Sequence, residues 1–552
     1  MITRRNWIAR SIVGGPFLAD SLRGENSEGL SPAIPFRTIY SNDTTHILSC
    51  KMPWRDRKDP LTDEHIAMSI REAAGVDAHF LQPGLGWIPW WKSEIYSPQE
   101  HYDEFLQKEQ GHQSINKIGR YLLEGGDMLQ TLVTTCREIG VAPFLSFRLN
   151  DGHHVRELKE ALETGKPSSG MSRFYWENYE RFRIGPDLSN WDEGVFDWAI
   201  PEVREHKFQL LEEACANYDL AGLELDFLRH WVRFGEATPP GERAVITTEF
   251  VKRVREMLDR TAAQRGLPRR WLCVRVPAKA NVRPEQGIDL YSLAKAGVDL
   301  VNLSYSYFTH QDDSIRLAVE ELGNERVAVY AEMTHCTLTG KATAGSGTQP
   351  FLRTTDEQFY TTAHLAYEQG ASGVSLFNFP YYRYHVTDAI GPFHEPPFSV
   401  LPKLHDREFL RQQSRWFFLS ACRRDRVLGE RALPVLIQRN EPVSVSMTMT
   451  ALGDDYRDGL LRLRSDEKID DREIEVRFNG ERLESAPFTA LPLPHLYGQT
   501  WIGTEKEHAC FSIPFTLVRD GSNTVEILVT GGIRVRVNFV EAVFERKNNA
   551  KV

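Results

Sequence analysis

Strand-like runs alternate with helical stretches eight times between about residues 40 and 400. This alternation predicts parallel strands joined by helical crossovers. The eight expected strands lie at residues 45–50, 76–82, 141–150, 222–227, 271–276, 300–305, 326–332 and 373–378. Eight such units within about 360 residues favour a (β/α)8 TIM barrel with long loops. An open doubly wound sheet normally needs fewer strands and a glycine-rich turn after the first strand, and Gly14-Gly15 lies in the wrong context for that turn.

The pattern changes after about residue 425. A helix is expected over residues 406–421, and short alternating strands follow at 443–449, 460–464, 474–478, 510–514, 524–529 and 534–539. The pairs Asn479-Gly480 and Asp520-Gly521 are typical of tight turns. We therefore expect a (β/α)8 barrel over residues 40–425 and a jelly-roll-like β-sandwich over residues 430–552. Such a second domain could bind carbohydrate or brace the barrel.

The N-terminus carries the pair Arg4-Arg5, an apolar residue two places on, and the short apolar stretch 11–18. This pattern is typical of a twin-arginine export signal. We therefore expect residues 1–30 to be a signal and the chain to be exported, to a periplasmic or extracellular location. The alternative is a frayed basic N-terminus.

Charge and composition exclude several classes of partner. The net charge is −10 and no basic stripe occurs, so a nucleic-acid partner is not expected. The sequence contains no run of 18 apolar residues, so no membrane span is expected. The seven cysteines are scattered without disulfide or zinc spacing. The oligomeric state is left open.

The stretch from Ala221 to His230 alternates apolar and acidic residues, which places Glu224 and Asp226 on one face of a short strand. Two carboxylates that face the inside of a barrel are costly to bury unless something needs them. Arg229 and His230 follow as the strand ends, where active sites of such barrels lie. The alternative is a structural ion-pair network.

Several other expected strands also finish with polar residues at alternate positions, which face the same side of the strand. In a barrel these residues would converge at one end of the interior. They are Arg148 and Asn150, with His154 in the next loop, then Arg275, Asn302, Tyr330, Glu332 and Asn378. The three arginines Arg148, Arg229 and Arg275 could keep carboxylates ionised or bind an anionic sugar. The alternative for each arginine is a salt bridge to Glu224 or Asp226.

Aromatic side chains gather in segments that otherwise resemble loops. Trp87, Trp90 and Trp91 lie in one segment, and Tyr382 lies in another. Because the apolar faces of sugars pack well on aromatic rings, these residues are candidates for carbohydrate binding. The alternative is ordinary packing of loops on the rim of the barrel.

The carboxylates best placed for chemistry are Glu332 on the seventh expected strand and either Asp226 or Glu224 on the fourth. These two strands face each other across the mouth of a barrel. Glycoside hydrolysis needs two carboxyl groups, one to protonate the leaving oxygen and one to attack the anomeric carbon or activate a water. Carboxyl groups about 5–5.5 Å apart predict retention of the anomeric configuration, and groups about 6.5–9.5 Å apart predict its inversion. Carboxyl groups more than about 12 Å apart are too distant for this mechanism. Glu332 must also face the barrel interior.

The segment Pro201-Glu-Val-Arg204, followed by residues 218–230, resembles the "PEVR…YDxDGIxLD" stretch of glycoside-hydrolase-like barrel proteins. Residues 41–45 and 83–92 resemble exported bacterial members of that group. The resemblance covers about residues 40–400 and implies a (β/α)8 fold and action on glycosidic bonds.

The large clan of retaining barrel glycosidases has an acid/base Glu at the end of strand four and a nucleophilic Glu at the end of strand seven. Glu332 matches the second position, but residues 223–226 read Leu-Glu-Leu-Asp where that clan has Asn-Glu. The α-galactosidase-like barrels use a strand-four Asp as nucleophile, which Asp226 would match with the roles exchanged. The resemblance therefore implies the pair and leaves its roles open.

We expect a glycoside hydrolase that acts on a poly- or oligosaccharide by two-carboxylate acid/base catalysis of the retaining type, without a cofactor. Asp226, Glu332 and Glu224 are the catalytic candidates. A non-catalytic carbohydrate-binding barrel is the first alternative, and it would bind glycan without turnover.

A metal-dependent hydrolase is the second alternative. Its ligands would be Asp226 and the histidines His153, His154, His310 and His335. The first strand lacks the His-x-His pair that this class would show, and adjacent histidines rarely bind one metal together.

Overall fold

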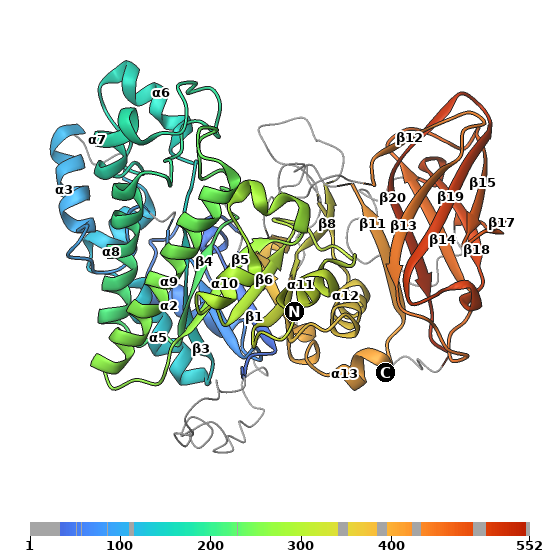
Figure 1. Cartoon of the computed structure of the whole chain (residues 1–552), viewed down its shortest axis with the longest axis horizontal. Helices are drawn as coiled ribbons and strands as arrows, with labels where there is room; N and C mark the ends of the chain where they lie inside the picture. The colour runs from blue at the N-terminus through green and yellow to red at the C-terminus, as the bar shows by residue number, and fades with distance from the viewer. Residues whose placement is uncertain are drawn as a thin grey trace, which may run out of the picture. The chain divides into compact units, whose positions relative to one another are not determined.

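The computed structural model describes residues 34–50, 52–56, 58–84, 87–109, 115–228, 230–339, 351–383, 395–421, 432–488 and 504–547. The expected export signal and Arg229 lie outside these ranges. Within them, no helix is both long enough and apolar enough to cross a membrane. From Pro35 onward the chain forms one compact unit, in which a barrel is followed by two antiparallel sheets (Figure 1).

Eight parallel strands close into a barrel in the order β1-β10-β7-β6-β5-β4-β3-β2. Their bounds are β1 Thr38–Asn42, β2 Ala78–Leu81, β3 Ala142–Arg148, β4 Gly222–Asp226, β5 Trp271–Pro277, β6 Leu300–Ser304, β7 Ala328–Thr334 and β10 Gly373–Phe377. The (β/α)8 barrel predicted from the sequence is confirmed, and seven of the eight expected strands lie where the alternation placed them. A short hairpin of β8 (Cys336–Thr339) and β9 (Phe351–Arg353) follows β7.

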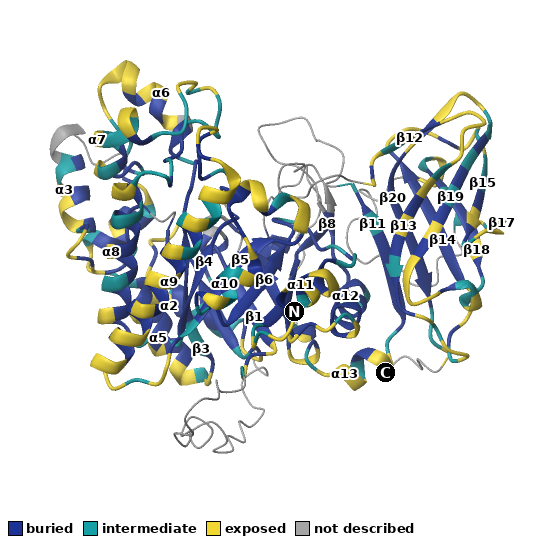
Figure 2. Cartoon of the chain, in the orientation of Figure 1, coloured by how far each residue is buried: buried dark blue, intermediate teal, exposed yellow. Residues whose placement is uncertain are grey.

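Helices cover the outside of the barrel, with buried faces toward the strands and exposed faces away from them (Figure 2). Their bounds are α1 Thr45–Ser49, α2 Asp63–Arg71, α3 Pro98–Glu109, α4 Lys117–Leu123, α5 Met128–Ile139, α6 Val155–Thr164, α7 Arg173–Phe182, α8 Pro201–Asn217, α9 Pro240–Gln264, α10 Leu290–Lys295, α11 Ser314–Leu322, α12 Asp356–Glu368 and α13 Arg407–Arg411.

Local signals explain where these helices begin and end. Asp127 caps α5 by accepting a hydrogen bond from the backbone N–H of Gln130, and Gly140 ends the helix in the left-handed conformation with φ 70°. On β4, Leu223 and Leu225 face outward and are fully buried, whereas Glu224 and its neighbours of the same parity face the interior.

The expected first strand at residues 45–50 is wrong, because those residues form α1 and the strand lies earlier. β1 pairs with β10 and β2, and every residue of β1 is buried. Thr44 adopts φ 64°, which turns the chain, and its carbonyl oxygen accepts the first helical hydrogen bond from Ile47 at 3.0 Å. The apolar run at 45–50 was too short to distinguish a strand from a helix.

The expected helix over residues 406–421 is also wrong in its second half. Asp406 caps the short helix α13, and the chain then enters β11 (Arg415–Ser420), which pairs with β20 (Arg534–Phe544). Trp416 and Phe417 are both fully buried there. The sandwich thus takes its first strand from before residue 425.

The C-terminal part is a β-sandwich of two antiparallel sheets, β11-β20-β14-β18-β17 with β12 beside β20, and β13-β19-β15-β16. The remaining bounds are β12 Val435–Gln438, β13 Val443–Met449, β14 Gly459–Ser465, β15 Glu473–Phe478, β16 Glu481–Arg482, β17 Glu484–Ser485, β18 His508–Ile513 and β19 Gly521–Gly531. Alternate residues of both sheets form one apolar core, as the period-two pattern predicted.

Replacing Gly222 by Ala should destabilise the barrel by about 1–3 kcal/mol, because the new methyl group would overpack the interior. A Cβ at Gly222 would lie 2.3 Å from the ring of Phe144 and from the backbone oxygen of Trp271. Urea denaturation checks this prediction. The control is Gly241→Ala, at a position in α9 with nothing within 4 Å, and equal stability of the two variants would contradict the prediction.

Candidate active site

The upper half of the barrel interior is polar. Strand register places Arg148 beside Asp226, Asp226 beside Arg275, and Arg275 beside Asn302. Glu332 lies opposite Ser375 on the next pair of strands. All of these side chains point inward, and their charged groups meet near the carboxyl ends of the strands, where barrel enzymes carry their active sites.

One guanidinium group holds the two candidate catalytic carboxylates together. The Nε and Nη2 atoms of Arg275 donate to Glu332 at 2.6 and 2.7 Å, and its Nη1 donates to Asp226 at 3.1 Å. Because guanidinium nitrogens lie about 2.3 Å apart, the bonded oxygens of Asp226 and Glu332 are at most about 8 Å apart. This bound is far below 12 Å and allows either stereochemical outcome.

The ion pairs lie in a strongly desolvated environment. Asp226 is 1% exposed, Arg275 2% and Glu332 3%. Burial raises the pKa of Glu332, and the opposing charge of Arg275 limits that rise. Burial alone would lower the pKa of Arg275, but the charges of Glu332 and Asp226 together raise it. The guanidinium is therefore firmly cationic, and it favours the ionised form of Glu332.

A second buried ion-pair cluster lies beside the first. Arg148 donates to Asp151 at 2.8 Å and to Asp43 at 3.3 Å. Asp43 also accepts hydrogen bonds from Asn378 at 3.1 Å and Tyr381 at 2.8 Å. Asp43 and Asp151 are functional-site candidates that the site residues predicted from the sequence did not include. Asp43 directly follows β1, and Asp151 lies in the loop three residues after the end of β3.

Gln82 connects the two clusters. Its side-chain nitrogen donates to Asp226 at 2.9 Å, and its side-chain oxygen accepts a hydrogen bond from Nε of Arg148. These partners fix the orientation of the amide, because only the nitrogen can donate and only the oxygen can accept. Gln82 directly follows β2, at an alternate position that faces the barrel interior. The same alternation identified Glu332, so Gln82 could have been predicted from the sequence.

Glu224 lies one layer deeper than Asp226 and is fully buried. It accepts hydrogen bonds from Ser146 at 2.7 Å and Asn302 at 3.3 Å, and a weaker one from the thiol of Cys273 at 3.7 Å. Burial and the nearby charge of Asp226 raise the pKa of Glu224 to about 7. Glu224 thus lies below the two carboxylates at the mouth, and the amide nitrogen of Asn302 lies 3.3 Å from both Glu224 and Glu332.

Strained backbone is concentrated at the same end of the barrel. Thr44, Ser306 and Asn378 all have positive φ, at 64°, 66° and 50°, and each follows a barrel strand by one or two residues. Such conformations cost on the order of 1–3 kcal/mol and often mark functional sites. The turn at Ser306 directs its carbonyl oxygen to Arg275, which donates to it at 3.2 Å.

Several aromatic candidates pack inside the protein. Trp87 is 1% exposed and donates to the backbone oxygen of Asp151 at 3.3 Å, and Trp91 donates to Glu213. Tyr382 is fully buried and donates to the backbone oxygen of Thr354. Trp90 is partly buried against the barrel core. These placements agree with the interpretation of loop packing on the rim.

Four other predicted residues lie outside the two clusters, and each has a different neighbourhood. Asn150 donates to the backbone oxygens of two loops, and His230 lies 3.3 Å from Asp192. The ring of His154 lies 4.0 Å from that of Tyr175, and burial lowers its pKa to about 3. The hydroxyl of Tyr330 donates to the backbone oxygen of Phe36, below the level of Glu332.

The histidines of the metal-site alternative do not gather around Asp226. His310 packs on Tyr305 with ring centroids 4.3 Å apart, and His335 lies beside Tyr381 at 5.3 Å. In the part of the chain that the structure describes, no group of three or more His, Cys, Asp or Glu residues is arranged to hold a metal ion.

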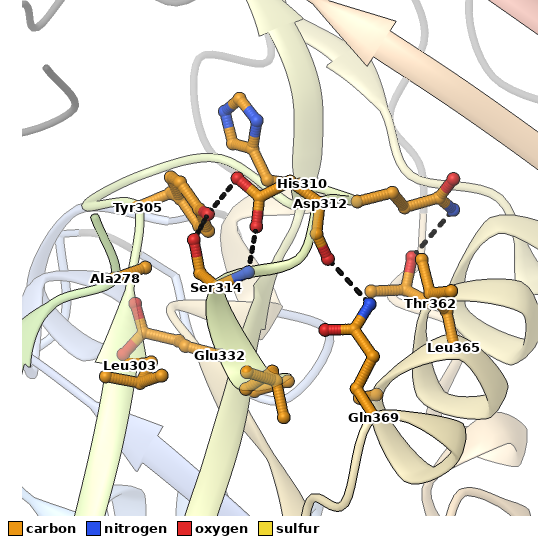
Figure 3. A pocket seen from close by; sticks show the side chains of 14 residues that line it. Ala278, Leu303, Tyr305, His310, Asp312, Ser314, Glu332, Thr362, Leu365 and Gln369 are labelled. Carbon is orange, nitrogen blue, oxygen red and sulfur yellow. Dashed lines mark hydrogen bonds between the residues drawn. The ribbon is translucent and has the colours of Figure 1, made fainter. Parts of the chain in front are cut away.

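A small pocket of about 30 Å³ lies outside the mouth, between β6 and β7 and the helices α11 and α12. Over it Tyr305 donates to Asp312, which also accepts a hydrogen bond from the backbone of Ser314 (Figure 3). The carboxylate of Glu332 points away from Leu365 in this view (Figure 3). Glu332 therefore faces the barrel interior, as the glycosidase interpretation requires.

Replacing Arg275 by Met should cost about 3–5 kcal/mol of unfolding free energy, because Asp226 and Glu332 would stay buried without their cation. The combined variant Arg275→Met, Asp226→Asn, Glu332→Gln should recover much of that loss, because it removes all three charges together. Urea denaturation at neutral pH measures both variants.

Arg260→Met is the control, because Arg260 is 47% exposed and pairs with Glu212 on the surface. That variant should change stability little. A single Arg275→Met variant as stable as the wild type would show that the buried charges do not depend on this guanidinium.

The sequence matches no protein-family model and no curated protein. The glycoside hydrolase domain of PgaB (BpsB) from Bordetella bronchiseptica is similar in structure, with a TM-score of 0.41, 9% identity, and coverage of 67% of this chain and 99% of that one. A glycoside hydrolase family 18 N-acetylglucosaminidase from Paenibacillus barengoltzii is also similar in structure, with a TM-score of 0.35 and 12% identity. The alignment again covers 67% of this chain and 99% of that one. A cycloisomaltooligosaccharide glucanotransferase from Paenibacillus sp. is similar with a TM-score of 0.31 and 10% identity. That alignment covers 91% of this chain but only 57% of the length of the glucanotransferase. Similarity at this level does not bear on what the chain catalyses.

Proposed function

We propose that the protein is a glycoside hydrolase in which Asp226 and Glu332 are the two catalytic carboxyl groups. The observation that carries the proposal is the shared contact with Arg275, which brings both carboxylates to the barrel mouth within about 8 Å. Two-carboxylate hydrolysis requires two carboxyl groups about 5–9.5 Å apart, and Asp226 and Glu332 reach this end of the barrel from two separate strands.

Arg275 also affects how the reaction would begin. A sugar that binds between Asp226 and Glu332 has to displace at least one of their ion pairs with the guanidinium. Release of Glu332 would leave a buried carboxyl group whose pKa is already raised by desolvation. A protonated Glu332 would then be suited to donate its proton to the leaving oxygen.

Asp226 would act on the other side of the sugar. Its oxygens accept hydrogen bonds from Gln82 at 2.9 Å and from the backbone N–H of Leu228 at 2.9 Å, which hold the carboxylate in place without Arg275. In this scheme Asp226 attacks the anomeric carbon or activates a water, and the glycosidic C–O bond breaks with its electron pair moving to the protonated oxygen.

A non-catalytic carbohydrate-binding barrel is the second candidate. It is favoured by one observation, namely that Asp226 and Glu332 are nearly fully buried and already paired. Both candidates place a carbohydrate at the same mouth, and turnover separates them. The Arg4-Arg5 pattern supports export of the protein in either case.

Asp226→Asn and Glu332→Gln should each lower kcat by orders of magnitude, because each removes a group that acts in the transition state. Hydrolysis of aryl glycosides and of plant and algal polysaccharides, followed by release of reducing sugar, provides the measurement. Circular dichroism of each variant should match that of the wild type.

The control is Glu205→Gln, which alters an exposed carboxylate of α8 that pairs with Arg253 at 2.6 Å. This variant should keep wild-type turnover. Near-normal kcat in both mouth variants would reject the assignment, and glycan binding without turnover by the wild type would favour the binding protein.

A further inference from the structure

Glu224 has an environment unlike those of the other carboxylates in the barrel. Among the described residues it forms no ion pair, and its hydrogen-bond partners are the Ser146 hydroxyl, the Cys273 thiol and the Asn302 amide. Burial raises the pKa of Cys273 well above its ordinary value, so the thiol stays neutral. A buried carboxylate with only neutral partners is strongly disfavoured.

The charges that face Glu224 do not compensate for its ionisation. Asp226 follows on the same strand, Glu332 approaches from β7, and Arg275 approaches from β5. Arg275 already shares its positive charge between Asp226 and Glu332. One guanidinium against two carboxylates already leaves an excess of negative charge, and a third ionised carboxylate would increase it.

The contacts of Glu224 also suit a protonated group. Its Oε1 atom lies 2.7 Å from the Ser146 hydroxyl, and a hydroxyl can accept a hydrogen bond as well as donate one. A proton on Oε1 would reverse this hydrogen bond without moving either residue. Oε2 would remain an acceptor for Asn302 and Cys273.

Asn302 connects Glu224 to Glu332. Its single amide nitrogen lies 3.3 Å from Oε2 of Glu224, from Oε2 of Glu332 and from the hydroxyl of Ser375. An amide nitrogen has two hydrogens for these three acceptors. Whether Glu224 is charged thus decides how strongly Asn302 can donate to Glu332.

We propose that Glu224 is protonated in the resting protein and that it acts, through Asn302, as a positioning residue for Glu332. The protonation of Glu224 does not depend on the proposed function. Its effect on Glu332 rests on that function, because Glu332 is a catalytic group only if the protein is a glycoside hydrolase.

Glu541 in the sandwich provides a contrast within the same chain. It is 2% exposed, but it forms an ion pair with Arg462 and accepts a hydrogen bond from Trp416 at 2.7 Å. Glutamine has nearly the shape of a protonated glutamate and carries no charge. The substitution should therefore preserve the native state of Glu224 and remove the native charge of Glu541.

The sign of the pH dependence follows from the raised pKa. Glu224 has a pKa of about 7 in the folded protein against an ordinary value of 4.5, so the folded state binds the proton more tightly. Its contribution to stability is complete below about pH 4.5 and is lost as the pH rises through about 7. The variant Glu224→Gln should not show this loss of stability at high pH, because its amide does not ionise.

Differential scanning calorimetry of Glu224→Gln and the wild type at several pH values between about 5 and 8.5 tests the protonation. The Tm of the variant minus that of the wild type should increase across this range and level off above about pH 8. The control Glu541→Gln should have a lower Tm than the wild type at every pH. A Tm difference for Glu224→Gln that is constant or falls with pH would overturn the proposal.

The pH dependence of kcat tests the positioning role. The wild type should show an ionisation near neutral pH in its kcat profile, and the profile of Glu224→Gln should lack that ionisation. Persistence of that ionisation would overturn the link to Glu332. If the wild type hydrolyses no glycoside, the proposed function and this link fail together, and the calorimetry still decides whether Glu224 is protonated.

Discussion

Arg275 places one positive charge between carboxylates that come from two separate strands of the barrel. It donates to Asp226 and to both oxygens of Glu332, and two further hydrogen bonds reach Ser304 at 2.9 Å and the backbone of Ser306. Burial favours the neutral form of Glu332, and the charge of Arg275 opposes that effect. The same contacts limit the distance between the two candidate catalytic groups and bind the carbonyl oxygen of Ser306, whose φ is 66°.

The polar interior is organised in layers whose carboxylates have different partners. In the upper layer, arginines pair with carboxylates, and Gln82 links the two clusters. One layer below, Glu224 has only neutral hydrogen-bond partners, so burial favours its protonated form. Asn302 connects the layers, because its amide nitrogen contacts both Glu224 and Glu332.

The sequence predicted what depends on local periodicity. The alternation of apolar and acidic residues along β4 correctly placed Glu224 and Asp226 in the barrel interior. The same alternation along the other strands placed Glu332 and Arg275 at the mouth of the barrel. The helix α1 and the strand β11 were misassigned, because pairing with distant strands decides whether a short apolar run is a helix or a strand. Partner choice could not be predicted either, since the pairing of Arg148 with Asp43 joins residues 105 positions apart.

The most direct test is a crystal structure of the protein with a bound iminosugar, whose cationic ring resembles the transition state of glycoside hydrolysis. The account predicts that the ring nitrogen contacts Asp226 or Glu332 and that Arg275 has moved away from at least one of them. An iminosugar bound elsewhere, with Arg275 still holding both carboxylates, would contradict it.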